Sequence, residues 1–154
     1  QRRLPISLSI SHSHGHAFCA LIQAQTGAAL APPVRRSVGC DIEYIETREE
    51  SFVRDFFTRE EMEAVVAAPA GQRDGLVTAL WSGKEAVLKA VREGLRVDTR
   101  QITCRFASAM PPATWEPFTV ELDPTLATRF PGVWSAWWWT REHFVLTIAL
   151  REET

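Results

Sequence analysis

Hydrophobic and polar residues alternate at several places along the chain with the period of two that is typical of β-strands. The segments with this pattern are residues 16–23, 37–44, 101–106, 118–122, 133–140 and 144–150. Only three residues separate the last two segments, so we expect them to form a hairpin. The strand segments predict one mixed, mainly antiparallel sheet.

The middle of the chain has the spacing of helices. Residues 50–57 are amphipathic, and a capping box predicts a helix over residues 58–68. The longest helix is expected over residues 75–93, with Asp74 as its N-cap and Gly94 just beyond its end. Its apolar face is formed by Leu76, Leu80, Val87 and Val91. The sequence therefore predicts an α+β fold in which a long helix packs against the sheet.

Length, composition and charge restrict the class of protein. A chain of 154 residues with 45% hydrophobic and 23% charged residues suits one globular domain over residues 1–154. A net charge of −2 without a dense basic cluster argues against nucleic-acid binding, and no apolar stretch reaches the ~20 residues of a membrane span. Cys19, Cys40 and Cys104 lack the spacing of a zinc site, so we expect reduced thiols in a cytoplasmic protein.

Two acidic residues are expected side by side on the strand over residues 37–44. Side chains alternate along a strand, which places Asp41 and Glu43 on the same face. Two neighbouring carboxylates repel each other unless water, a basic side chain or a divalent cation lies between them. Taken alone, the pair is more typical of a solvated sheet edge.

A polar stripe runs along the long helix. Trp81, Glu85 and Lys89 follow one another at intervals of four residues, roughly opposite the apolar face. Such a stripe can contact a ligand, although a surface Glu–Lys pair worth about 0.2–0.5 kcal/mol would give the same pattern. Lys84 lies toward the apolar side of the helix, so a structural role for it is an alternative to ligand contact.

Five segments, taken together, resemble the 4′-phosphopantetheinyl transferase superfamily and, within it, the surfactin-type branch. In chain order they are SISHS from Ser9, VGCDIE from Val38, FFTREE from Phe56, WSGKEAVLKA from Trp81 and EGL from Glu93. The resemblance extends over residues 9–95, with a weaker match in the closing hairpin, and the joint pattern is far more specific than any one segment. It implies a 4′-phosphopantetheinyl transferase-like fold.

The resemblance also implies an activity. Such proteins transfer the 4′-phosphopantetheine arm of coenzyme A to a serine of an apo acyl or peptidyl carrier protein, and release adenosine 3′,5′-bisphosphate. By position, Asp41, Glu43 and Glu85 would bind a Mg²⁺ ion that bridges the pyrophosphate. Glu85 would take the proton of the serine hydroxyl, directly or through a metal-bound water. Lys84 and Lys89 would pair with phosphate oxygens, with Lys89 better placed because it shares the face of Glu85.

The first matched segment begins a stretch that holds three of the four histidines of the chain. The resemblance implies that Ser11 and His12 hold a phosphate of coenzyme A. His12, His14 and His16 could instead bind zinc or nickel, but Gly15 interrupts the strand and no cysteine lies at the spacing of a fourth ligand. We therefore interpret His14 and His16 as loop or strand-start residues.

The chain departs from the family pattern at two places. Arg92 occupies a position where the family helix usually ends in glycine, and the connection over residues 24–37 is longer than usual. Glu61 matches a family glutamate, although its place in the capping box explains it equally well.

Domain organisation follows from the resemblance. We expect residues 1–23 to contribute the trailing strand of a preceding half and residues 37–150 to form the main repeat with the magnesium site. Single-repeat relatives form trimers with active sites between subunits, so a second copy or an upstream domain is expected to complete the cleft. The alternative is a non-catalytic domain that docks carrier proteins within a larger synthase.

Overall fold

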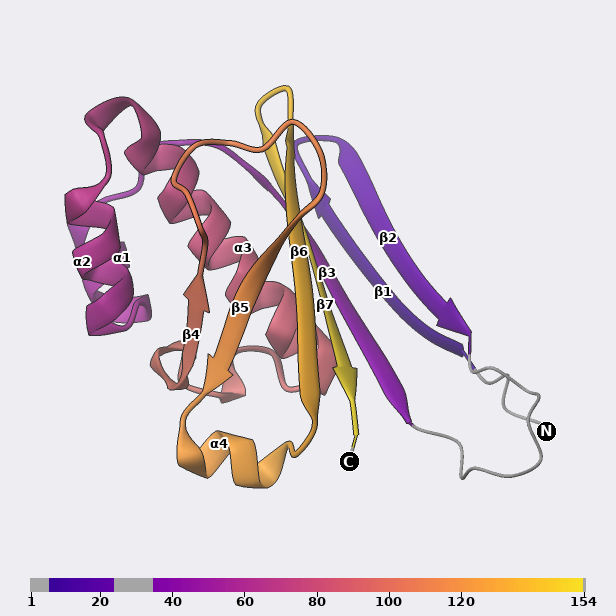
Figure 1. Cartoon of the computed structure of the whole chain (residues 1–154). Helices are drawn as coiled ribbons and strands as arrows, with labels where there is room; N and C mark the ends of the chain where they lie inside the picture. Colours follow the sequence, from indigo (N-terminus) through magenta and orange to yellow (C-terminus); the bar gives the residue numbers. More distant parts are fainter. Residues whose placement is uncertain (1–5, 24–34, 154) are drawn as a thin grey trace.

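The computed structural model describes residues 6–23 and 35–153. Within these residues, seven strands form two antiparallel sheets (Figure 1). The smaller sheet is the hairpin of β1 (Ile6–Ser13) and β2 (His16–Gln23). The larger sheet has the order β3-β7-β6-β5-β4, and its strands are β3 (Arg36–Tyr44), β4 (Ile102–Arg105), β5 (Glu116–Leu122), β6 (Val133–Arg141) and β7 (Phe144–Glu152).

One long helix covers one face of the larger sheet (Figure 1). Two of the shorter helices lie beside the β4 edge of this sheet, and another lies at one end of its strands. The α-helices are α1 (Glu50–Phe56), α2 (Arg59–Ala67), α3 (Arg73–Val91) and α4 (Pro124–Arg129). Three short 3₁₀ turns are η1 (Ala70–Gln72), η2 (Gly94–Arg96) and η3 (Thr99–Gln101). Within the described residues, no helix combines the length and the apolar character that a membrane span needs.

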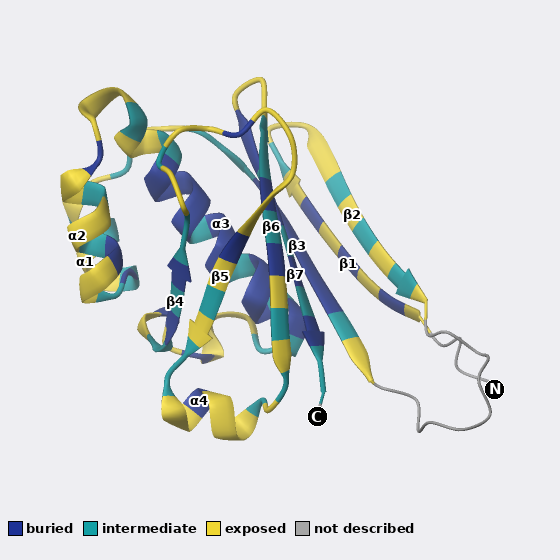
Figure 2. Cartoon of the chain, viewed as in Figure 1, coloured by how far each residue is buried: buried dark blue, intermediate teal, exposed yellow. Residues whose placement is uncertain are grey.

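The core lies between α3 and the larger sheet (Figure 2). From Leu76 to Ala90 every residue of α3 is buried except Trp81, Glu85 and Lys89, so the predicted polar stripe is the one side of the helix that reaches solvent. The remaining sides of α3 pack against β3, β7, β4 and α2.

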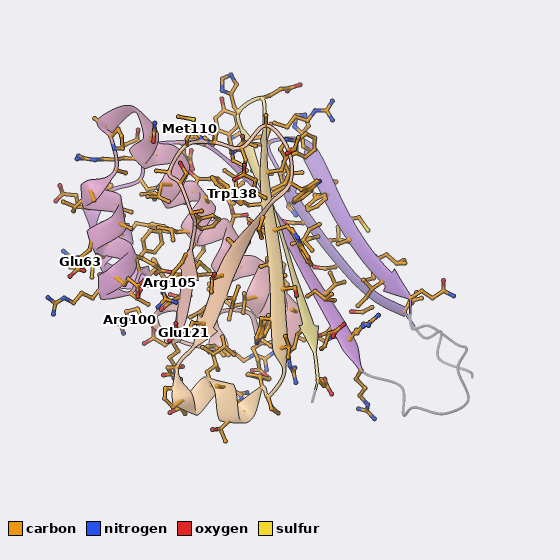
Figure 3. The ribbon with its side chains drawn as sticks, in the orientation of Figure 1. Glu63, Arg100, Arg105, Met110, Glu121 and Trp138 are labelled. Atoms are coloured by element: carbon orange, nitrogen blue, oxygen red, sulfur yellow. The ribbon has the colours of Figure 1, made fainter. Side chains whose placement is uncertain are left out.

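The sheet contributes large aromatic side chains to this core. Trp138 points toward α3 and is almost fully buried (Figure 3), whereas Trp137 and Trp139 lie half-buried on the opposite face of β6. At the edge of the sheet, Arg105 of β4 pairs with Glu121 of β5 (Figure 3) and with Glu60 of α2. These ion pairs fasten α2 and the edge strand to each other at the surface.

The α+β class, the long helix and the closing hairpin are confirmed. The ends of the long helix differ from the prediction. Asp74 is not its N-cap, because the helix begins at Arg73 and the Asp74 carboxylate accepts a hydrogen bond from the Thr47 hydroxyl at 2.7 Å. The helix ends when Arg92 adopts a left-handed backbone conformation (φ 61°), two residues before the predicted stop at Gly94.

The strands form two sheets where the sequence predicted one, and residues 6–23 contain two strands where one was expected. The sequence analysis did not predict β1 because the usual pattern of apolar residues inside and polar residues outside is inverted in this strand. Its inward positions carry serines, and its outward positions carry Ile6, Leu8 and Ile10. The short helix α4 was also missed. Most of the long connection expected over residues 24–37 lies outside the described residues.

Serine hydroxyl groups attach the hairpin to the free edge of β3. The Ser7 hydroxyl accepts the backbone N–H of Val38 at 3.2 Å, and the Ser9 hydroxyl accepts that of Cys40 at 2.9 Å. These side chains replace the backbone partners that a neighbouring strand would supply. β1 therefore lies beside β3 without joining its sheet.

Candidate active site

The side chains of the candidate site come from β3 and α3, which approach each other very closely. A Cβ atom at Gly39 would lie 1.8 Å from the carbonyl oxygen of Ala86, so this position tolerates only glycine. Asp41 lies two residues beyond Gly39 on the same strand, and Glu85 directly precedes Ala86 on the helix. The glycine thus allows the acidic residues of two distant segments to meet.

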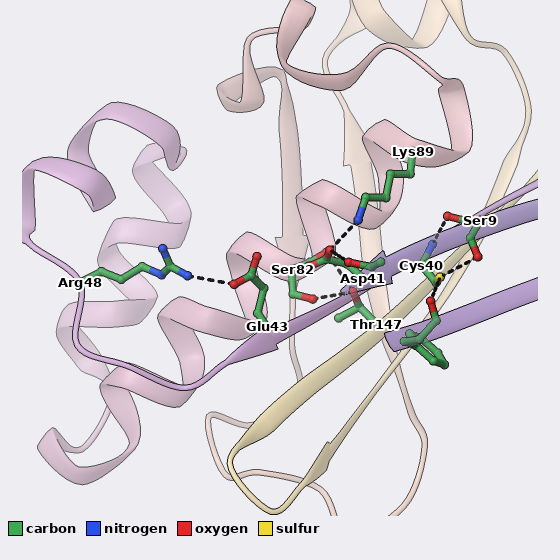
Figure 4. Close-up of polar contacts among 10 residues, drawn as sticks. Ser9, Cys40, Asp41, Glu43, Arg48, Ser82, Lys89 and Thr147 are labelled. Atoms are coloured by element: carbon green, nitrogen blue, oxygen red, sulfur yellow. Dashed lines mark hydrogen bonds and ion pairs between the residues drawn. The ribbon is translucent and has the colours of Figure 1, made fainter. Parts of the chain in front are cut away.

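Asp41 is the most buried acidic residue of this group, with 2% of its surface exposed. Its Oδ1 atom accepts hydrogen bonds from the Lys89 ammonium and from the Ser11 hydroxyl, each at 2.7 Å. Figure 4 shows the ion pair with Lys89. The Oδ2 atom of Asp41 is buried and has no hydrogen-bond partner in the part of the chain that the structure describes, which is costly for a carboxylate oxygen.

Glu43 points along the same face of β3 but has a different partner. Its Oε2 atom accepts a hydrogen bond from the Arg48 guanidinium at 3.1 Å (Figure 4). Burial raises the pKa of Glu43, and the negative charge of Asp41 raises it further. Arg48 and a hydrogen bond from Trp81 oppose this rise in pKa. Glu43 is therefore harder to ionise than a free glutamate even with its own cation beside it.

Glu85 completes the acidic group from the side of the helix. Burial is the main cause that raises the pKa of Glu85, and the charges of Asp41 and Glu43 add to it. The nearby Lys89 ammonium lowers the pKa of Glu85 in part. Asp41 is thus close enough to Glu43 and Glu85 to affect the ionisation of both.

These carboxylates have the chemistry of a site for a divalent cation. Hard cations such as Mg²⁺ prefer carboxylate oxygens, and a bound cation would both partner the Oδ2 atom of Asp41 and relieve the repulsion that raises the pKa of Glu43 and Glu85. The side chains are not yet gathered around one point. Over residues 6–23 and 35–153, no three His, Cys, Asp or Glu side chains are arranged to hold a metal ion. The donor set fits a cation, and side-chain rotation would have to bring it together.

Ser11 and His12 point to opposite faces of β1. The Ser11 hydroxyl is buried and donates a hydrogen bond to Asp41, so Ser11 helps to position this carboxylate. His12 is exposed on the other face of the hairpin, away from the carboxylates. The structure therefore separates two residues that the sequence analysis assigned to one phosphate.

His14 and His16 occupy the tip of the hairpin, in agreement with their interpretation as loop and strand-start residues. The His14 ring stacks on Tyr44 at 4.5 Å between centroids, and the His16 ring contacts Phe144 at 4.6 Å. Both rings pack the hairpin tip against the end of the larger sheet. Together with the exposed His12, they do not form a metal site within the described residues.

Lys84 lies apart from the acidic group, contrary to the expectation that it contacts a phosphate. Its side chain is fully buried, and its ammonium pairs with the Glu61 carboxylate at 2.8 Å. The same ammonium donates hydrogen bonds to the carbonyl oxygen of Thr99 at 2.8 Å and to that of Ile102. With three partners inside the core, Lys84 serves the fold.

Glu61 takes the capping-box role, one of the two explanations that the sequence left open. Its carboxylate accepts the backbone N–H of Thr58, which completes the predicted capping box, and the backbone N–H of Cys104 at 2.8 Å. Through Lys84 it also joins α2 to α3. Glu61 is therefore a structural residue that connects two helices and β4.

Arg48 is the residue of the site that the sequence analysis missed. It lies in the connection between β3 and α1, and its guanidinium lies 4.7 Å from the centroid of the Phe52 ring. The one signal in the sequence is a basic residue five positions after Glu43 and four before an aromatic residue. That spacing occurs too often to indicate a contact by itself.

Comparisons with known proteins place the chain among relatives. The sequence model of the 4′-phosphopantetheinyl transferase superfamily matches residues 37–149. No curated protein sequence matches the chain. The fold is similar to that of the holo-[acyl-carrier-protein] synthase from Neisseria meningitidis, with a TM-score of 0.62 and 20% identity over 76% of this chain and 98% of that one.

Two further solved structures have the same fold. A Chronobacterium ammoniagenes synthase in complex with coenzyme A gives a TM-score of 0.58 and 15% identity, over 77% of this chain and 98% of that one. The Thermotoga maritima holo-[acyl-carrier-protein] synthase gives a TM-score of 0.59 and 15% identity. The match covers 77% of this chain and 64% of the Thermotoga chain.

Proposed function

Because the chain belongs to the 4′-phosphopantetheinyl transferase superfamily, we propose that it transfers the 4′-phosphopantetheine arm of coenzyme A to a serine of an apo acyl or peptidyl carrier protein. The observation that carries this proposal is the acidic group of Asp41, Glu43 and Glu85 beside the Lys89 ammonium. Two structures with a similar fold were determined in complex with coenzyme A, one of them from Bacillus anthracis. The order of the SISHS and VGCDIE segments supports the surfactin-type branch.

Asp41, Glu43 and Glu85 are the residues that would hold Mg²⁺. When bound, the ion would neutralise negative charge on the pyrophosphate of coenzyme A. Ser11 keeps the Asp41 carboxylate in place through its hydrogen bond. Lys89, whose side chain is 28% exposed, lies where its ammonium can leave Asp41 and pair with a phosphate oxygen.

The reaction is a displacement at phosphorus. The serine Oγ of the carrier protein bonds to the phosphorus that carries the pantetheine arm, and the bond from that phosphorus to the bridging oxygen of the pyrophosphate breaks. The electron pair leaves with adenosine 3′,5′-bisphosphate. Glu85 takes the serine proton as the general base. Lys89 offers positive charge to the leaving phosphate.

A further surface is needed to complete the coenzyme A cleft. The face of the β1–β2 hairpin that points away from β3 is apolar and open: Ile10 is 60% exposed, and Ile6, Leu8 and Leu21 are exposed beside it. His12 lies on the same face. We propose that a second copy of the chain or an upstream segment covers this face, and that His12 then meets a phosphate of coenzyme A. This agrees with assigning residues 1–23 to a preceding half and residues 37–150 to the main repeat.

The three cysteines bear on the compartment. Cys19, Cys40 and Cys104 are all free thiols, and Cys19 is exposed. Exposed free thiols are typical of proteins in a reducing compartment, which supports a location in the cytoplasm.

A non-catalytic carrier-protein docking domain is the second candidate function. It is favoured by Arg92, which takes a left-handed conformation at the end of α3 where the family pattern has glycine. A docking domain would bind a carrier protein without coenzyme A and without a metal ion, so binding and turnover can be separated by experiment.

The proposal is tested by measuring the release of adenosine 3′,5′-bisphosphate from coenzyme A in the presence of an apo carrier protein and Mg²⁺. We expect release that stops when EDTA is added and in the Asp41→Asn and Glu85→Gln variants. The matched control is Glu63→Gln, which removes an exposed carboxylate of α2 that pairs with Arg59 on the same helix. Carrier binding without release, in a folded protein, would favour the docking domain.

A further inference from the structure

Arg48 is a charged residue beside the acidic group that the proposed reaction does not use. Its Nη2 atom donates to the Oε2 atom of Glu43 at 3.1 Å and lies 3.7 Å from the Oε1 atom of Glu46. The guanidinium lies 4.7 Å from the centroid of the Phe52 ring, and only 18% of the side chain is exposed. Charge and stacking together hold Arg48 in one position.

The ring beneath the Arg48 guanidinium belongs to an aromatic cluster that joins α1 to α3. The Phe52 ring contacts the Trp81 ring at 5.0 Å and the Phe56 ring at 4.9 Å between centroids. Trp81 also contacts Phe56, at 5.2 Å. The Phe52 ring under the guanidinium is thus packed against two other rings, and a rotation of Glu43 toward the other carboxylates would break its hydrogen bond with Arg48.

Glu43 is turned toward Arg48 in the structure, while Asp41 is engaged with Lys89 (Figure 4). The backbone of β3 would allow another arrangement, because Asp41 and Glu43 lie on the same face of the strand. Yet no three potential ligands within the described parts of the chain converge on one point. The contact with Arg48 accounts for the position of Glu43 away from the group.

We propose that Arg48 is the counter-ion of Glu43 in the metal-free protein and competes with the divalent cation for this carboxylate. Binding of the cation then transfers Glu43 from the guanidinium to the metal, and the strength of the Arg48–Glu43 contact sets the metal affinity. This inference rests on the proposed function, because it requires a cation at Asp41, Glu43 and Glu85. Without Arg48, the empty site would hold three carboxylates, and Lys89 would be the one cation in contact with them among the described residues, which favours cation binding.

The test is the affinity for Mn²⁺, measured by electron paramagnetic resonance on the whole chain without coenzyme A. We expect Arg48→Gln to bind Mn²⁺ about two- to fivefold more tightly than the wild type, as the loss of a partly exposed competing ion pair allows. The Mn²⁺ affinity of Arg48→Lys should lie between those of the wild type and Arg48→Gln, because lysine keeps the charge but lacks the planar guanidinium that stacks on the Phe52 ring. Arg54→Gln is the matched control, since Arg54 is on the surface of α1 and pairs with its exposed neighbour Asp55.

A double-mutant cycle shows whether Arg48 acts through Glu43. In a Glu43→Gln background, Arg48→Gln should leave Mn²⁺ affinity unchanged. Unchanged or weaker Mn²⁺ binding by Arg48→Gln in the native background would overturn the inference while leaving the metal site standing. Failure of the wild type and of every variant to bind Mn²⁺ would overturn the metal site itself. Thermal unfolding without metal checks that each variant is folded, and Arg48→Lys carries the comparison if Arg48→Gln is not.

Discussion

Replacing Lys84 with methionine separates a structural lysine from a ligand-binding one. Methionine keeps most of the length of the side chain and loses the ammonium. That ammonium is fully buried and contacts the Glu61 carboxylate and the carbonyl oxygens of Thr99 and Ile102. Its removal leaves Glu61, which is 1% exposed, as a buried charge without a countercharge.

The expected cost is large because a buried ion pair is broken on one side only. Removal of one partner costs about 3–5 kcal/mol, out of a stability of about 5–15 kcal/mol for an ordinary domain. A loss of 1 kcal/mol lowers the Tm of a domain of 150–250 residues by about 2–4 °C, so Lys84→Met should lower the Tm by roughly 6–20 °C.

Urea unfolding followed by tryptophan fluorescence measures this loss, and the affinity for coenzyme A is measured under conditions in which the variant is folded. Lys89→Met, on the same helix with a partly exposed side chain, should weaken coenzyme A binding. Adding Glu61→Gln to Lys84→Met should recover part of the lost stability, because it removes the unpaired charge. A Lys84→Met variant that keeps its stability but loses coenzyme A affinity would refute the structural role.

Three other substitutions test the site and its supports. Glu85→Gln should raise the stability of the metal-free protein by about 0.5–2 kcal/mol at neutral pH, as measured by thermal unfolding. The pKa of Glu85 is raised in the folded state, so this carboxyl group stabilises the fold when protonated, and that contribution is lost as the pH rises through the folded pKa. The gain in stability from Glu85→Gln should shrink in acid. If the wild type has its maximum stability at neutral pH and the variant does not, the expectation is contradicted. Gly39→Ala forces a Cβ against the Ala86 carbonyl, so it should lower the free energy of unfolding in urea by at least about 1–3 kcal/mol and should also weaken metal binding. Unchanged Mn²⁺ binding would show that the site does not need β3 and α3 to lie so close together. Ser9→Ala leaves the Cys40 N–H without its acceptor and should lower the free energy of unfolding by about 1–3 kcal/mol in the same assay. A loss below a few tenths of a kcal/mol would mean that water replaces the hydroxyl group.

Local patterns in the sequence predicted most of the elements, and the resemblance to the family predicted that the acidic residues of β3 and α3 form one group. Alternation placed Asp41 and Glu43 together on a strand, and a spacing of four placed Glu85 and Lys89 on one side of a helix. The capping box at Thr58 is present as predicted. These features depend on residues that are close in sequence, so their spacing is enough to reveal them.

What the sequence could not predict depends on partners far along the chain. Lys84 lies at the flank of the apolar face, and only the carbonyl groups of residues 99–102 and the Glu61 carboxylate make its burial possible. β1 carries serines on its inner face because they bond to the edge of β3, a role that hydrophobic alternation does not reveal. Arg48 was missed for a different reason: Glu43 and Phe52 are close to it in sequence, but their spacing is too common to indicate a contact.

The most direct test of the account is the intact mass of an apo carrier protein after incubation with this chain, coenzyme A and Mg²⁺. The account predicts that the carrier gains the mass of one phosphopantetheine, that EDTA prevents the gain, and that Glu85→Gln prevents it while the variant stays folded. A carrier of unchanged mass, in the presence of folded wild-type protein that binds both Mn²⁺ and coenzyme A, would contradict the proposed transfer.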